Sequence, residues 1–442
     1  MTSPASQGSA AANDLIEHGA SLVRAGRVSE AEAYFREALH HDPNAVPAHA
    51  FIASIAFRGS QYHAAALAYE RCVQINPSYP DLWFNLATAR EKTGDIDGAV
   101  DAYLRALHLN PKDARIALFT GAALEAAGRR EDAAMVFSLG NDIDPAFLAG
   151  MDRADAHPEV RFRAITADRV IRRHFTQLHA DSVAESAGMS TGHAGAPAEL
   201  ARVINAIWVQ THDKPFTYGT RKHEPSIFYM PDLEARTITP REALPWVAAV
   251  ESATEVIRNE YLAAASNGAQ FAPYVEQSVS AQSWRELRGN TDWSSIHLFK
   301  AAQEAPNARL FPRTLQALEA ADIVRVEGGT PIELFFSRLK PGTHIPPHYG
   351  ACNNRLTVHL PLIVPEACAI RVRDDVHAWR EGEIFAFDDS FEHEAWNRSD
   401  RDRVVLIFES HHPELSTIER FAIERAFEAR GRWLKHRRIP PA

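Results

Sequence analysis

The chain has 442 residues, of which 45% are hydrophobic and 24% are charged, and its formal net charge is −10 at pH 7. A chain of this length exceeds one ordinary hydrophobic core, so we expect a globular protein of two or three domains. The negative charge disfavours a nucleic acid or an anionic membrane as a partner held by bulk electrostatic attraction. Three cysteines, Cys72, Cys352 and Cys368, form no CxxC pair and no even framework, which favours a reducing compartment.

The N-terminal segment, MTSPASQGSAAANDL, has neither the basic start nor the apolar core of a signal peptide. No segment approaches the roughly 18 consecutive apolar residues that a membrane-spanning helix needs. We therefore expect a cytoplasmic protein without a membrane span.

A pattern with a period of 34 residues organises the first third of the chain. The repeated positions are a small residue (Gly19, Ala53, Ala87, Gly121), an alanine (Ala31, Ala65, Ala99, Ala133), an aromatic residue (Phe35, Tyr69, Tyr103, Phe137) and a proline (Pro43, Pro77, Pro111, Pro145). Small residues let two helices approach, the aromatic residue fills the gap between successive helix pairs, and the proline ends the second helix.

Helix pairs with this period and these columns resemble tetratricopeptide repeats, and we expect about four of them over residues 13–145. Such an array presents a concave face that binds a peptide or a protein. Amphipathic helix pairs without a ligand would give the same pattern, so the repeats alone leave both interpretations open. Residues 146–200 are expected to hold a capping helix and a mobile linker, because Asp181–Ala201 is rich in Ser, Gly and Ala.

The pattern changes after about residue 200. Helices are predicted over residues 240–265, with Pro240 near the first turn, and over residues 312–322. Short segments of alternating polarity follow, broken by Pro, Gly and Asp-Asp turns, and they predict an antiparallel sandwich or barrel. The predicted strands lie within ELFFSRLKPG, NRLTVHLPLIV, AIRVRD, GEIFAFDD and RVVLIFES.

The strand within NRLTVHLPLIV carries most of the functional information. Its apolar face consists of Leu356, Val358, Leu360 and Leu362. The opposite face presents Arg355, Thr357 and His359. If the apolar face packs against helices, the polar row points into a cavity, where a histidine and an arginine need partners. We therefore predict a barrel whose interior binds a ligand.

Further polar residues accompany this strand. His344 and His348 are four residues apart, but Pro346 and Pro347 lie between them and exclude a helical metal-binding pair. His393 is predicted at the mouth of a turn. The candidate site consists of Ser337, His348, His359, His393 and Arg403.

Three ordered blocks, GTHIPPHYGACNNRLTVHLPLIVP, GEIFAFDDSFEHEAWN and RVVLIFESHHPEL, resemble the aspartyl/asparaginyl β-hydroxylase family of iron(II)- and 2-oxoglutarate-dependent oxygenases. The resemblance covers roughly residues 215–420, and some members also carry tetratricopeptide repeats. It implies an α+β multidomain protein in which an α-helical repeat solenoid precedes a double-stranded β-helix. This jelly-roll, cupin-like oxygenase domain is expected at residues 201–430.

The resemblance also implies the metal ligands. Most such oxygenases hold iron with two histidines and one carboxylate. His348 and His393 match the two histidines. The carboxylate two residues after the first histidine is missing in this family, and Gly350 occupies that position here. His344 is either a residue that orients His348 or a turn cap.

The remaining matches concern the co-substrate. Arg403 matches the arginine that binds the distal carboxylate of 2-oxoglutarate, with Ser337 as a hydroxyl helper. His359 matches a histidine near the metal-bound end, and Arg355 matches an arginine of the active-site lining that faces a substrate carboxylate. Members often carry a second arginine at the position of Thr357. Threonine removes that positive charge, which argues against the family's usual acidic substrate.

Acidic residues near His393 could be mistaken for the absent carboxylate. Asp388, Asp389 and Glu392 are instead expected to orient the loop through backbone hydrogen bonds. His411 and His412 are expected to be structural.

The implied function is that of a dioxygenase that uses iron(II), 2-oxoglutarate and dioxygen to hydroxylate the β-carbon of an Asp/Asn-type residue. The substrate is expected to be a peptide or protein engaged by the repeats. Two alternatives stay open: a hydroxylase of a small-molecule or lipid-linked acyl substrate, and a non-catalytic repeat adaptor.

Overall fold

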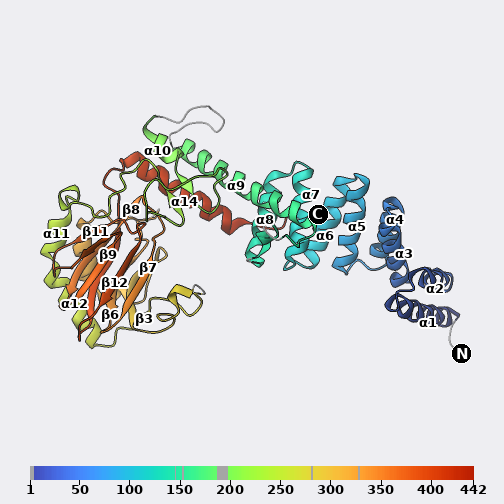
Figure 1. The fold of residues 1–442 in the computed structure, drawn as a ribbon, viewed down its shortest axis with the longest axis horizontal. Coiled ribbons are helices and arrows are strands. Elements are labelled where there is room, and N and C mark those ends of the chain that lie inside the picture. The colour runs from blue at the N-terminus through green and yellow to red at the C-terminus, as the bar shows by residue number, and fades with distance from the viewer. Residues whose placement is uncertain (1–3, 145, 152–153, 187–197, 280–281, 327–328) are drawn as a thin grey trace. The chain divides into compact units, whose positions relative to one another are not determined.

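A computed structural model of the chain describes residues 4–144, 146–151, 154–186, 198–279, 282–326 and 329–442. It consists of two compact units (Figure 1). The first is Met1–His174 with Arg432–Ala442, and the second is Phe175–Gly431. No helix within the described ranges is long and apolar enough to cross a membrane.

The first unit begins with the predicted helix pairs. They are α1 (Pro4–Arg24), α2 (Val28–His41), α3 (Val46–Arg58), α4 (Tyr62–Ile75), α5 (Pro80–Thr93), α6 (Ile96–Leu109), α7 (Ala114–Ala126) and α8 (Arg130–Ile143). Pro43, Pro77 and Pro111 each follow the second helix of a pair, as predicted, whereas Pro145 lies outside the described residues.

The repeated columns form the interior of these pairs. The alanine and aromatic columns are buried throughout. A Cβ added at Gly121 would lie 2.6 Å from Phe137 Cδ1, and one added at Gly19 would lie 3.0 Å from Phe35 Cε2. The small residue therefore makes room for the aromatic ring of its own pair, which explains why the two columns share one period.

The predicted capping helix is α9 (Pro158–Ser186), preceded by the short 3-10 helix η1 (Phe147–Met151). Arg163 of α9 is buried and donates to Glu91 of α5 at 2.9 Å and to Glu159 at 2.8 Å. The prediction of a linker from Asp181 was wrong at its start, since α9 continues to Ser186. Residues 187–197 lie outside the described residues.

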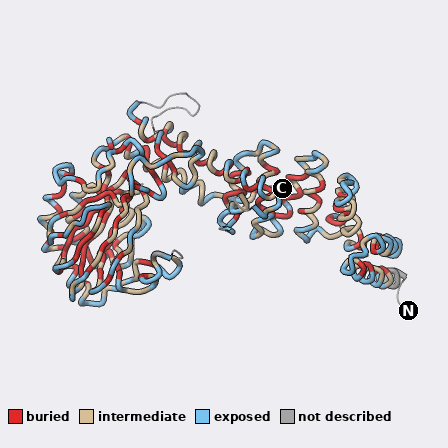
Figure 2. Tube along the Cα trace, in the orientation of Figure 1, coloured by how far each residue is buried: buried red, intermediate tan, exposed pale blue. Residues whose placement is uncertain are grey.

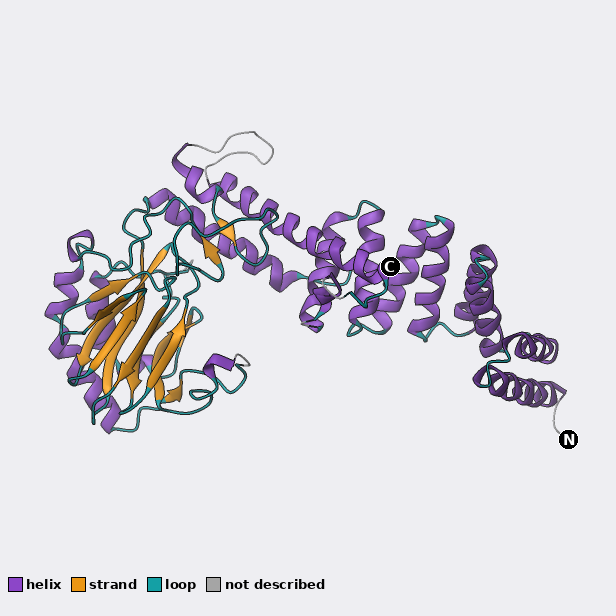
Figure 3. Ribbon diagram, viewed as in Figure 1, coloured by secondary structure: helices purple, strands orange, loops and turns teal. Residues whose placement is uncertain are grey.

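Two antiparallel sheets form the second unit (Figure 3). The larger sheet has the order β11 (Phe385–Phe387), β8 (Arg355–Ile363), β13 (Arg403–His411), β6 (Leu334–Leu339), β4 (Trp293–Lys300) and β3 (Ala272–Pro273), with β5 (Gln303–Glu304) beside β4. The smaller sheet has the order β10 (Asp375–His377), β9 (Cys368–Val372), β12 (His393–Asn397) and β7 (His344–His348). A separate short pair joins β1 (Ile207–Trp208) to β2 (Phe228–Tyr229).

Strands β4, β7 and β12 were not among the predicted strands. His393 lies at the mouth of a turn, as predicted, because it begins β12 just after the turn at Asp389 and Ser390. The local sequence HIPPH, with two prolines, contains little strand signal. Its partner β12 supplies the pairing that keeps this segment extended.

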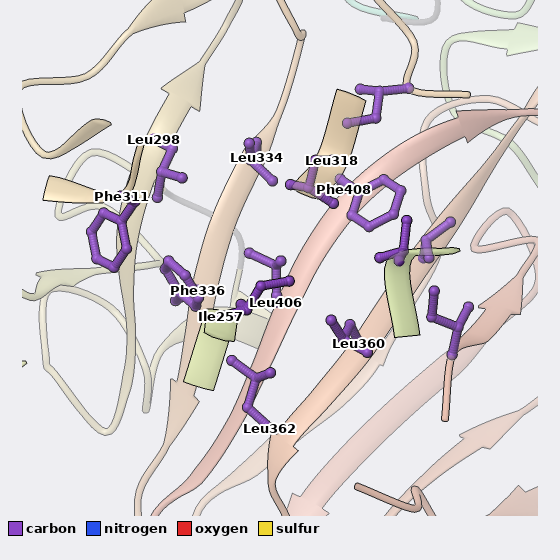
Figure 4. Packing of buried hydrophobic residues seen from close by; sticks show 14 of the residues in the cluster. Ile257, Leu298, Phe311, Leu318, Leu334, Phe336, Leu360, Leu362, Leu406 and Phe408 are labelled. Atoms are coloured by element: carbon purple, nitrogen blue, oxygen red, sulfur yellow. The ribbon is translucent and has the colours of Figure 1, made fainter. Parts of the chain in front are cut away.

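Helices cover the outer face of the larger sheet. They include α11 (Val247–Ser252), α12 (Thr254–Ser266) and α13 (Pro312–Ala317). Buried residues concentrate in the strands of the second unit (Figure 2). The apolar face of β8 is fully buried, as predicted, in the hydrophobic cluster between the larger sheet and these helices, where Figure 4 shows Leu360 and Leu362. The single helix predicted over residues 240–265 was wrong: the segment forms η3 (Arg241–Ala243), α11 and α12. Pro245 lies between the first two, where a missing N–H interrupts the helical hydrogen bonds.

The remaining elements complete the second unit. They are η2 (Ala198–Leu200), α10 (Ala201–Ile204), η4 (Gln282–Trp284), η5 (Ala308–Leu310), η6 (Leu318–Ala320) and α14 (Thr417–His436), the last of which ends in the first unit. The helix α14 was not predicted.

Candidate active site

A cavity lies between the inner faces of the two sheets of the second unit. Its charged and polar lining consists of Glu333, Ser337, His348, Thr357, His359, Asp389, His393, Arg403 and Glu409, with Tyr274 and Trp293. All five residues of the candidate site, which are spread over β6, β7, β8, β12 and β13, thus meet in one cavity. The polar row of β8 faces this interior through Thr357 and His359.

His348 and His393 are direct partners across the β7–β12 pairing, and their ring centroids are 4.0 Å apart. Each ring places Nδ1 2.9 Å from a backbone carbonyl two residues earlier, that of Pro346 or Phe391. A carbonyl only accepts, so each Nδ1 carries the proton and each Nε2 keeps its lone pair. Burial lowers the pKa of both histidines, which keeps the imidazoles neutral.

Two neutral imidazoles with free Nε2 atoms fit a transition-metal ion such as iron(II). The carbonyl partners of Nδ1 hold the rings in orientation, as in known metal sites. In the described parts of the chain, no group of three or more His, Cys, Asp and Glu side chains is placed to hold a metal ion. The donor set that the geometry offers is therefore the histidine pair.

The space beside Gly350 is filled by Asp389. A Cβ added at Gly350 would lie 2.1 Å from Asp389 Oδ1, and Thr357 Oγ1 donates to Asp389 Oδ2 at 3.0 Å. Burial raises the pKa of Asp389 to about 7, and the charges of Asp388 and Glu409 add to this effect. The expectation that Asp389 only orients its loop was wrong. That role belongs to Asp388, whose Oδ1 accepts the backbone N–H of Ser390 at 3.0 Å.

Arg403 is 1% exposed, and its guanidinium points into the cavity. Its Nη1 donates to Ser337 Oγ at 3.3 Å, and its guanidinium carbon lies 4.8 Å from the Trp379 ring centroid. Its Nε has no hydrogen-bond partner, and no carboxylate in the described ranges pairs with it. Burial lowers the pKa of Arg403 to about 10, so it remains charged at neutral pH. A buried cation without an anion is costly, and it indicates an anionic ligand.

Two neighbours complete this end of the cavity. Trp293 Nε1 donates to Ser337 Oγ at 3.1 Å, so the serine oxygen accepts two bonds and its own proton is left to donate. His359 is buried, its Nδ1 has no partner, and burial followed by the charge of Arg403 lowers its pKa to about 3. Trp293 was missed because β4 was not predicted, although WSSIHLFK combines β-branched and aromatic residues that favour a strand.

The structure places two other candidates elsewhere. Arg355 does not line this cavity: its Nη1 donates to Glu409 Oε2 at 2.6 Å, and it lines a second cavity beside α14. The expectation that Arg355 belongs to the lining of the active-site cavity was therefore wrong. His344 does not orient His348 either, since its Nε2 lies 2.7 Å from Glu394 Oε2 and its side chain is half-exposed.

Comparisons with known proteins found matches to both parts of the chain. Residues 251–413 match the family model described as aspartyl/asparaginyl beta-hydroxylase, and residues 16–80 and 56–123 match tetratricopeptide repeat models. The chain is 38% identical over 136 residues to the aspartyl/asparaginyl beta-hydroxylase of Mus musculus, covering 30% of this chain and 18% of that protein. It is 34% identical over 166 residues to the ornithine lipid ester-linked acyl 2-hydroxylase of Rhizobium tropici, covering 37% of this chain and 56% of the relative.

Among solved structures, the tetratricopeptide repeat protein YrrB is 21% identical, with a TM-score of 0.29, over 35% of this chain and 84% of YrrB. The chain spans about a fifth of the length of the mouse relative and about half of the bacterial one. The range that matches the family model, residues 251–413, contains His348, His393 and Arg403 of the cavity. The chain therefore carries, after tetratricopeptide repeats, a domain of the aspartyl/asparaginyl beta-hydroxylase family.

Proposed function

We propose that the second unit is a double-stranded β-helix oxygenase that depends on iron(II) and 2-oxoglutarate and hydroxylates a C–H bond of its substrate. One observation carries the proposal. The buried, unpaired Arg403 lines the same cavity as the neutral pair His348 and His393. This combination suits a ligand with a carboxylate at one end and a metal-binding group at the other.

His348 and His393 would hold the metal through Nε2, because their Nδ1 atoms are already bonded to carbonyls. Iron(II) with 2-oxoglutarate supplies dioxygen activation, in which one oxygen atom enters the substrate and the other enters succinate as CO₂ leaves. The protein keeps both imidazoles deprotonated by burial, which a metal ligand requires.

Arg403 would bind the distal carboxylate of 2-oxoglutarate. A guanidinium can hold a carboxylate through two parallel charge-assisted hydrogen bonds, and the unpartnered Nε leaves that fork available. Ser337 would donate its hydroxyl proton to the same carboxylate, since its oxygen already accepts from Arg403 and Trp293. The neutral His359 would lie beside the bound co-substrate.

The repeats support a peptide or protein as the substrate or partner, because arrays of this kind bind extended chains. A repeat adaptor without catalysis fits less well, because the metal-binding pair and the carboxylate-binding arginine lie in one cavity. The bacterial relative is named for a lipid-linked acyl substrate, so the class of substrate must be tested directly.

The test is succinate formation from 2-oxoglutarate, together with 2-oxoglutarate binding measured by calorimetry under anaerobic conditions with iron(II). We expect succinate only when iron(II) is present, and binding that Arg403→Ala weakens strongly. Arg338→Ala is the matched control, because Arg338 lies on β6 but does not line the cavity. Absence of 2-oxoglutarate binding in the unmodified protein would contradict the proposal.

A further inference from the structure

The cavity has two chemically different ends. Along β13 the inward-facing side chains run from Arg403 to Glu409, six residues apart, which corresponds to roughly 20 Å of extended strand. Glu409 is the direct neighbour of Thr357 in the β13–β8 register. Thr357 in turn donates to Asp389. The end away from Arg403 is therefore lined by carboxylates, and Glu333 adds a third.

Each of these carboxylates has one oxygen bound and one oxygen without a hydrogen bond. Glu333 Oε1 accepts from the Ala301 backbone N–H at 3.0 Å. Asp389 Oδ2 accepts from Thr357 at 3.0 Å, and Glu409 Oε2 accepts from Arg355 at 2.6 Å. Within the residues that the structure describes, the second oxygens of Glu333, Asp389 and Glu409 have no hydrogen-bond donor.

Like charges gather at this end without a full counter-charge. Arg355 offsets Glu409, and His297 Nε2 lies 3.7 Å from Glu333 Oε2. Burial lowers the pKa of His297 to about 4, so this imidazole is neutral at pH 7, and the lining groups Thr357 and Tyr274 carry no positive charge. Burial raises the pKa of Glu333, and the charge of Glu409 adds to that increase. The charges of a bound iron(II) ion and a 2-oxoglutarate dianion would sum to zero, and the remaining positive charge of Arg403 lies at the opposite end of the cavity from Glu333 and Glu409.

We propose that the substrate group entering this end is a cationic nitrogen group, an ammonium or guanidinium, held by Glu333, Asp389 and Glu409. This inference rests on the proposed function, because it places the cation in the cavity that holds the histidine pair. An aspartate side chain would instead meet the negative charges of Glu333 and Glu409 and be repelled. That the cavity binds a ligand is supported separately by the buried, unpartnered atoms of Arg403 and His359.

Thr357 is central to this specificity. The short hydroxyl leaves Asp389 free to meet a substrate, whereas an arginine at this position would pair with Asp389 and bring a positive charge. The aromatic rings of Tyr274 and Phe335 also line the cavity, and such rings attract cations through their faces.

The experiment uses the full chain loaded anaerobically with iron(II) and 2-oxoglutarate. The binding of five fluorescent peptide pools is compared. Each pool has a random sequence around one fixed central residue, which is arginine, lysine, citrulline, asparagine or aspartate. Citrulline has nearly the shape of arginine without its charge. We expect the arginine or lysine pool to bind at least about tenfold more tightly than the citrulline pool, and the aspartate pool to bind most weakly. Free arginine and a free alkylamine form a second arm, which shows whether the cation must belong to a peptide.

Single substitutions test which residues determine the preference for a cationic probe. Glu333→Gln should reduce the preference for the cationic probe several-fold, because it removes a charge and retains the shape. Glu304→Gln, an exposed residue of β5, is the matched control and should leave the preference unchanged. Thr357→Arg should shift the preference towards aspartate.

The outcomes separate the two proposals. If 2-oxoglutarate does not bind, the proposed function fails. If 2-oxoglutarate binds but the cationic probes bind no better than citrulline, or aspartate binds best, only the cationic-substrate inference is overturned. Adding oxygen then provides an independent readout, since the preferred pool should gain one oxygen atom in its mass as succinate forms.

Discussion

Replacing Arg403 tests the link between an unpaired buried charge and 2-oxoglutarate. In Arg403→Ala the distal carboxylate of 2-oxoglutarate would enter the buried end of the cavity without a cation to pair with. Breaking a buried charge pair costs about 3–5 kcal/mol, and Arg403 is 1% exposed, so solvent screens little of this. At about 1.4 kcal/mol per decade, the dissociation constant for 2-oxoglutarate should rise by roughly two to three and a half orders of magnitude.

Replacing Arg403 with an apolar residue of similar length should not lower the stability of the ligand-free protein. Without ligand, Arg403 has no carboxylate partner in the described structure, so Arg403→Met should leave the free energy of unfolding unchanged or raise it by about 1 kcal/mol. Arg403→Lys should recover part of the binding, because an ammonium cannot form the two-bond fork.

Calorimetry with 2-oxoglutarate and denaturant unfolding without ligand measure the two effects, with Arg338→Ala as the control. A dissociation constant that changes less than threefold in Arg403→Ala would refute the reasoning. So would loss of peptide binding with intact 2-oxoglutarate binding, which would place Arg403 in the substrate region.

Three other predictions follow from the site and its surroundings. His348→Ala or His393→Ala should abolish iron-dependent succinate formation while the thermal unfolding curve keeps its cooperativity, and iron-dependent turnover in either variant would rule out the histidine pair. Gly350→Ala should cost about 1–3 kcal/mol in a urea titration because its Cβ would overlap Asp389, and Asp389→Ala in the same chain should restore most of that loss. Burial lowers the pKa of His179 from its ordinary 6.5 to about 4. As the pH falls, His179 therefore becomes protonated in the unfolded chain before it does so in the folded chain. Stability present above about pH 6.5 should therefore fall as the pH falls towards 4, by up to about 3 kcal/mol from this group, and His179→Gln should flatten that slope in urea titrations at pH 7.5 and 5.0.

The repeats and the central strand of the domain were predictable because each repeats a simple physical pattern. The 34-residue columns require paired helices with small residues facing aromatic rings, and Gly121 against Phe137 shows that contact. The alternation in β8 separates an apolar face from a polar one, so Thr357 and His359 were placed inside the cavity from sequence.

Other features depend on partners far away in sequence. Asp388 and Asp389 are adjacent, and turn chemistry predicts the same role for both. Only the folded chain shows that Asp389 points into the cavity and fills the space beside Gly350. The sequence also gives no sign that a larger residue at position 350 would meet Asp389. Arg355 is similar, because its pairing with Glu409 depends on the register between β8 and β13.

The central claim is that one cavity binds iron(II) and 2-oxoglutarate together. Native mass spectrometry of the full chain under anaerobic conditions tests it most directly, with iron(II) and 2-oxoglutarate added separately and together. The account predicts one iron ion and one 2-oxoglutarate per chain, with the co-substrate retained by the unmodified protein and lost from Arg403→Ala. When both are added, retention of iron without 2-oxoglutarate, or equal retention of 2-oxoglutarate by the unmodified protein and Arg403→Ala, would contradict it.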